Sequence, residues 1–105
     1  MDRRATLLRL TAEFSGAGAA ADWERLGTAA RLLGAQLSTL AAQGPWSSAE
    51  RSALALLRAA HAEAMAACAQ ALDALGARLD EMRSNKDGWI AYALASDTEP
   101  AGHPA

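Results

Sequence analysis

The stretch from Trp46 to Arg83 constrains the fold most, because neither proline nor a β-branched residue interrupts it. Ser47 and Glu50 stand three residues apart at its start, which is the spacing of a helix-capping box. As a single helix it would extend about 54 Å, at about 1.5 Å per residue. We therefore predict that a helix from about Ser48 to Arg83 is the longest element of the chain.

The apolar residues of this stretch fall on two neighbouring helical faces. At 100° per residue, one stripe about 100° wide collects the larger side chains. It holds Leu54, Leu57, His61, Ala64, Met65, Cys68, Leu72, Leu75, Leu79 and Met82. The shallower face beside it holds Ala53, Leu56, Ala60, Ala67, Ala71 and Ala74. Because one neighbouring helix cannot cover both faces, we expect the protein to self-associate as a homodimer.

The composition favours an all-α fold with a thin core. The chain has 105 residues, which suggests one small domain that buries about two-thirds of its unfolded surface. It contains no valine, and Ile90 is its only isoleucine, so it has little material for strands. Much of its apolar content is alanine, which contributes little transfer free energy on burial.

Charge and cysteine content narrow the classes of partner and the compartment. The net charge of −2 leaves no basic surface typical of nucleic-acid binding. No apolar run is long enough to span a membrane. Cys68 is the single cysteine, so no disulfide can form within the chain, which is consistent with a reducing, cytoplasmic location.

The first half of the chain predicts two helical segments. Asp2 can cap a first helix that runs to about Phe14, and the Gly16–Gly18 stretch then weakens the helical pattern. From Asp22 the pattern resumes, and Gly44 followed by proline ends it. The large apolar residues of the second segment, with one alanine, alternate in steps of three and four: Trp23, Leu26, Ala30, Leu33, Leu37 and Leu40.

These segments allow two arrangements. The first two segments, laid nearly in line with a bend near Gly16–Gly18, would match the long helix and form an elongated antiparallel hairpin. We favour this arrangement. A hairpin turn at the same glycines would instead give a compact three-helix bundle.

The C-terminal part predicts a short separate helix. The cluster Ser84–Gly88 is rich in residues that break helices, and a short apolar segment follows it to Leu94. Two turns are not stable alone in water. We therefore expect the segment to fold back, with Trp89 and Tyr92 covering the end of the long helix. Residues 96–105 have the composition of a disordered tail.

The predicted fold is thus all-α. It is an elongated antiparallel helical hairpin or bundle of three to four helices, with one long central helix and a short C-terminal helix. Residues 1–95 form a single domain in this prediction, and residues 96–105 form the tail.

No arrangement of residues indicates catalysis. His61 and Cys68 are seven residues apart, about 10 Å along a helix, which is too far for one metal ion or for a nucleophile and its base. Paired carboxylates such as Asp80 and Glu81 have no apolar pocket to shift a pKa. We therefore expect no enzyme activity, no cofactor and no metal; a metal-binding bundle is the weakest of three hypotheses.

Three features together resemble the FliT-type flagellar type III export chaperones. An apolar helix is followed by Asp22-Trp23 with Leu26 three residues later. The long helix ends in Leu-Gly-Ala-Arg-Leu-Asp-Glu-Met-Arg over residues 75–83, and the segment Lys-Asp-Gly-Trp-Ile-Ala-Tyr follows over residues 86–92. The resemblance covers about residues 5 to 94.

This resemblance implies a small cytosolic chaperone that holds the filament-capping protein unassembled before export. It also implies contacts with the export ATPase complex or a flagellar regulator, and a C-terminal segment that covers the binding surface. The residues expected to bind the protein partner are Met65, Leu72, Leu75, Leu79, Met82, Trp89 and Tyr92. The alternative is a helical adaptor or structural dimer unrelated to secretion, without a groove for a client.

Overall fold

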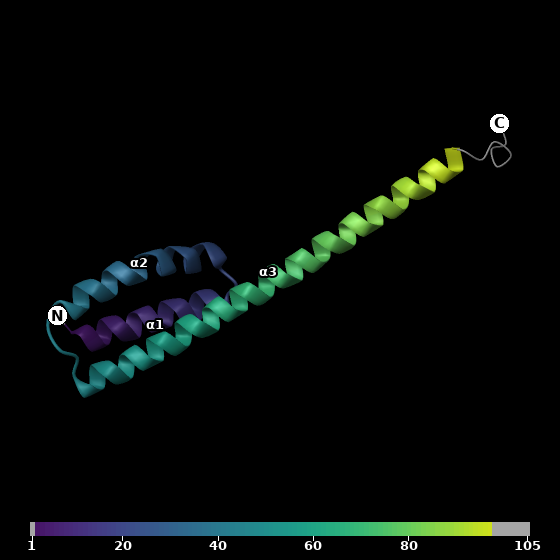
Figure 1. Ribbon diagram of the computed structural model, residues 1–105. Helices are drawn as coiled ribbons and strands as arrows, with labels where there is room; N and C mark the ends of the chain where they lie inside the picture. Colours follow the sequence, from purple (N-terminus) through teal and green to yellow (C-terminus); the bar gives the residue numbers. More distant parts are fainter. Residues whose placement is uncertain (1, 98–105) are drawn as a thin grey trace. The chain divides into compact units, whose positions relative to one another are not determined.

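The computed structural model describes residues 2–97 and consists of three helices (Figure 1). They are α1, Arg3–Ala19, α2, Trp23–Ala41, and α3, Ser48–Asp97. No strand occurs among the described residues, which confirms the all-α prediction with one long helix. Residues 98–105, most of the predicted tail, lie outside the described part, whereas Ser96 and Asp97 belong to α3.

The chain divides into two units, Met1–Gln70 and Ala71–Ala105, with the boundary inside α3. In the first unit α1, α2 and the teal first part of α3 lie side by side and enclose the core (Figure 1). That core consists of Leu7, Leu10, Phe14, Ala17, Leu26, Leu40, Ala53, Leu57, Ala60 and Ala64. All three helices contribute to it, so this unit is a three-helix bundle.

The chain reverses direction after α1, so the favoured prediction of an elongated hairpin with a bend at Gly16–Gly18 is wrong. Both glycines lie inside α1, and the reversal occurs at Ala21, whose φ is +53°. The amide of Asp22 donates to the carbonyl of Ala17 at 2.9 Å, and the amide of Ala21 to that of Gly18 at 3.2 Å. This pairing is a Schellman end, built here with alanine in the left-handed position that glycine usually occupies.

Gly18 serves packing rather than bending. A Cβ atom at this position would lie 3.2 Å from the Cβ and 3.3 Å from the Cα of Ala64. Because Gly18 has no side chain, the C-terminal end of α1 can approach α3 closely. The compact bundle, which was the alternative arrangement, follows from this approach and from the reversal at Ala21.

Asp22 caps α2, and the predicted cap of α3 is confirmed. A carboxylate oxygen of Asp22 accepts from the amide of Arg25 at 3.2 Å at the start of α2. Before α3, the amide of Glu50 donates to Ser47 Oγ at 3.1 Å, and the amide of Ser47 donates to Glu50 Oε1 at 2.7 Å. These reciprocal bonds satisfy the capping box that the sequence predicts.

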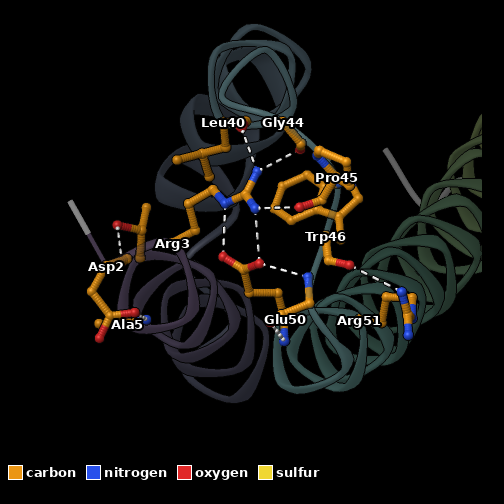
Figure 2. A network of polar contacts seen from close by, with 11 residues as sticks. Asp2, Arg3, Ala5, Leu40, Gly44, Pro45, Trp46, Glu50 and Arg51 are labelled. Atoms are coloured by element: carbon orange, nitrogen blue, oxygen red, sulfur yellow. Dashed lines mark hydrogen bonds and ion pairs between the residues drawn. The ribbon is translucent and has the colours of Figure 1, made fainter.

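Arg3 joins the ends of all three helices (Figure 2). Nε and Nη2 donate to the two carboxylate oxygens of Glu50 at 2.7 and 2.8 Å. Nη1 donates to the carbonyls of Leu40 and Gly44 at 3.1 and 2.9 Å, and Nη2 to that of Pro45 at 2.7 Å. Its guanidinium also lies 4.5 Å from the centre of the Trp46 ring. All five N–H donors of the guanidinium are therefore used.

The predicted break at Ser84–Gly88 is wrong, because α3 continues through it to Asp97. Ser, Asn, Asp and Gly each cost less than or about 1 kcal/mol in a helix, whereas proline costs about 3 kcal/mol. Between Pro45 and Pro100 the chain has no proline, so the helical hydrogen bonds can continue. There is consequently no separate short C-terminal helix in residues 84–97.

Candidate protein-binding surface

The second unit of the chain carries a row of large apolar side chains that are exposed to solvent. Leu72, Leu75, Leu79 and Met82 are exposed by 63, 52, 50 and 64 %, respectively. The same applies to Trp89, Ile90, Tyr92 and Leu94 farther along α3. Most large apolar residues of the first unit lie in or against the core, so this accumulation marks α3 beyond Gln70 as the candidate binding surface.

The exposed residues follow a regular spacing. Leu72, Leu75, Leu79, Met82, Lys86, Trp89 and Ala93 alternate in steps of three and four, and together they are called the C-terminal seam below. A repeat of 3.5 residues is the spacing of a helix that packs against another helix in a left-handed coiled coil. The C-terminal seam therefore has the spacing of a surface that packs against another helix.

Trp89 and Tyr92 form the aromatic part of this surface. Their rings meet edge to face, with centroids 6.5 Å apart. Both side chains are largely exposed, at 72 and 69 %. Together with Ser84, Asn85 and Gly88 they line a shallow depression beside the C-terminal seam. Aromatic side chains that are exposed in the free protein are frequent anchors in protein interfaces.

The predicted cover over this surface is wrong. Trp89 and Tyr92 belong to the same continuous helix as Leu72 and Met82, so they cannot fold back onto them. A straight helix keeps residues that are ten or more positions apart about 15 Å or more along its axis. The residues that were expected to be covered are accordingly exposed.

Met65 differs from the other residues predicted to bind a partner. It is half-buried and packs against the core of the bundle, as does Cys68. His61 also packs there, with its ring edge to face against Phe14 at a centroid distance of 5.2 Å. The stripe predicted from the sequence thus has two roles: up to Cys68 it packs against the bundle core, and from Leu72 it is exposed.

Sequence reasoning missed two parts of this surface. Ile90 and Leu94 are exposed apolar residues that were not among the predicted binding residues. Ile90 and Leu94 are four residues apart, which places both on one side of a continuous helix, and this spacing was a signal that could have identified them. The assumed break at Ser84–Gly88 concealed that continuity.

An apolar groove also lies on the bundle. Leu33 and Leu37 of α2 line it together with Leu54 and Leu57 of α3, and Arg58 and His61 complete its lining. Its volume is about 330 Å³. Its leucines are buried or half-buried and belong to the core or pack against it, so it offers less accessible apolar surface than the C-terminal seam.

Neither a metal site nor a membrane span was found in residues 2–97. Within this range no group of three or more His, Cys, Asp or Glu side chains is placed to hold a metal ion. No helix of the described part is long and apolar enough to cross a bilayer. Comparisons of the chain with protein-family models, with curated proteins and with solved structures found no match.

Proposed function

We propose that the protein is a small helical chaperone that binds another protein through the C-terminal seam and holds it in an unassembled state. The observation that carries this proposal is the exposure of Leu72, Leu75, Leu79 and Met82 on a single helix face. Full burial of a large apolar side chain contributes roughly 1.5 kcal/mol or more of favourable free energy, and a partner that covers these side chains would gain this contribution.

The class of partner comes from the resemblance to FliT-type flagellar export chaperones. By that resemblance the client is the filament-capping protein, bound in the cytoplasm before type III secretion, and the export ATPase complex or a flagellar regulator is a further contact. The autoinhibitory cover is not part of this proposal, because the segment that would form it continues α3. No cofactor or turnover is involved.

An adaptor without a secretion client remains the second candidate. The 3.5-residue repeat of the C-terminal seam supports it, because this spacing also suits permanent helix pairing in a structural complex. The two candidates differ in the partner rather than in the surface that binds it.

Co-expression with the C-terminal segment of the filament-capping protein from the same genome tests the proposal. We expect a soluble complex that co-purifies with the full chain and is lost in the Leu75→Ser/Leu79→Ser variant. The matched control is Leu32→Ser/Leu56→Ser, since these leucines are exposed to a similar degree, 53 and 55 %, but lie on the bundle. A complex that survives the first variant, or no complex with the wild type, contradicts the proposed function.

A further inference from the structure

We infer that the partner on the C-terminal seam is an amphipathic helix whose apolar stripe is flanked by acidic side chains. This inference rests on the proposed function in one respect, namely that the seam binds a protein. It adds the chemistry of that partner, and it follows from how the charged residues of α3 are distributed around the helix.

The positive charges of this part of α3 lie on the side of the C-terminal seam. At 100° per residue, Arg78 and Arg83 fall in the two rows that border the seam, and Lys86 lies in the seam itself. All three side chains are exposed. In paired helices these border rows face the border rows of the partner, where charges determine which partner is accepted.

The negative charges lie on the opposite side. The carboxylates of residues 71–93 are Asp73, Asp80, Glu81 and Asp87, and each is more than about 100° from the centre of the seam. None of them falls in the seam or in its border rows. The helix therefore presents a positively charged apolar face and a negatively charged back, although the chain as a whole carries a net charge of −2.

The three cations are available to a partner. The ion pairs found within residues 2–97 are those of Arg3 with Glu50 and of Arg25 with Glu13, and neither involves Arg78, Arg83 or Lys86. Acidic side chains on both borders of a docked helix would supply the missing partners. Complementary border charges give specificity and faster association in such pairs.

A second copy of the chain fits the same face less well. In a parallel pair, Arg78 of one copy lies beside Arg83 of the other, and the two Lys86 side chains meet in the seam. In an antiparallel pair the border rows of residues 71–93 still contribute no carboxylate, so the positive charges of both copies accumulate. Like charges across an interface select against that pairing. The charge distribution therefore favours a different, acidic helix.

Two synthetic peptides of three heptads test the inference on the full chain. Both carry leucine at the seam positions; one carries glutamate and the other lysine in the border rows. In fluorescence anisotropy at low salt, we expect the glutamate peptide to bind roughly tenfold more tightly than the lysine peptide. A few exposed ion pairs gained, and like-charge repulsions avoided, account for a difference of this size. This advantage should shrink at about 0.5 M salt because the ions screen exposed charges.

Two matched variants separate local charge from net charge. Arg78→Gln/Arg83→Gln/Lys86→Gln should bind both peptides equally. Arg4→Gln/Arg9→Gln/Arg58→Gln removes the same charge from exposed positions on the bundle and should keep the preference. A control variant that loses the preference to the same extent would overturn the inference, since net charge would then explain it.

The remaining outcomes distinguish this inference from the proposed function. Equal binding of both peptides by the wild type overturns the acidic partner and leaves the docking surface in place. Binding of neither peptide, while the filament-capping segment still co-purifies, also overturns only the inference. A dimer of the chain alone in sedimentation that Leu79→Ser abolishes would place a second copy on the seam and overturn it.

Discussion

Arg3 and Glu50 join the first turn of α1 to the first turn of α3 through two hydrogen bonds of 2.7 and 2.8 Å. The same carboxylate completes the capping box with Ser47. The Arg3 guanidinium also satisfies the carbonyl of Leu40 at the end of α2. The side chain of Arg3 thus connects one end of each of the three helices of the bundle.

The stability of the bundle should depend on acid through Glu50. Hydrogen bonds from Arg3, and then from the Ser47 backbone, lower the pKa of this carboxyl to about 2 from 4.5. Because the folded state favours the charged form, the contribution is fully present above about pH 4.5 and is lost as the pH falls towards 2. The hydrogen bond from Arg25 lowers the pKa of Glu13 and adds a loss in the same direction.

Thermal unfolding of the wild type and of Glu50→Gln, followed by circular dichroism from pH 7 to pH 2, tests this dependence. The variant should melt at a clearly lower temperature at pH 7, and the difference should narrow towards pH 2. Glu63→Gln, at an exposed position on α3, is the control and should match the wild type throughout. A constant difference between wild type and Glu50→Gln across this range would contradict the role of the Glu50 charge.

The two glycines Gly18 and Gly34 should respond in opposite ways to alanine. Nothing lies within 4 Å of a Cβ placed at Gly34, so Gly34→Ala should stabilise α2 by about 0.5–1 kcal/mol. At Gly18 the new Cβ would press on the backbone of Ala64, and such overpacking costs about 1–3 kcal/mol. This cost exceeds the gain in helix propensity, so Gly18→Ala should destabilise the protein. Chemical denaturation measures both, and stabilisation by Gly18→Ala would refute the close approach of α1 and α3.

Local capping signals could be read from the sequence, because each depends on a few adjacent residues. Asp2 caps α1, and the pair Ser47 and Glu50 caps α3, as the sequence predicts. The reversal after α1 could not be located in the same way. Gly18 resembles a helix breaker in sequence, but its role depends on Ala64, and alanine at position 21 gives no signal for a left-handed conformation.

The candidate site was predicted in part. Leu72 to Met82 stood out through their helical spacing, and the structure places them on one helix in exposed positions. Beyond Met82, Trp89 and Tyr92 are also predicted to bind, but in a segment that folds back, whereas the structure places them on the continuous α3; Ile90 and Leu94 are not predicted. The low helix propensities of residues 84–88 are too small to end a helix here. Proline would end it, but the sequence has no proline between residues 46 and 99.

Removing residues 84–105 should leave the bundle stable and weaken binding. Every residue of the core, and every residue packed against it, lies at or before Cys68. The melting temperature of the truncated chain should therefore equal that of the full chain. Binding of the glutamate-flanked peptide should decrease, because the truncation deletes Lys86, Trp89 and Ala93 from the C-terminal seam. An increase in affinity would instead indicate that the deleted segment covers the surface.

The most direct test compares Leu79→Ala with Leu26→Ala in both stability and affinity for the filament-capping segment. Leu26 is 2 % exposed, and its truncation should cost about 2–5 kcal/mol of unfolding free energy while the folded fraction still binds normally. Leu79 is 50 % exposed, and its truncation should change stability by less than about 0.5 kcal/mol but weaken binding about tenfold. If Leu79→Ala instead unfolds the protein, or leaves the affinity unchanged, the C-terminal seam is not the binding surface.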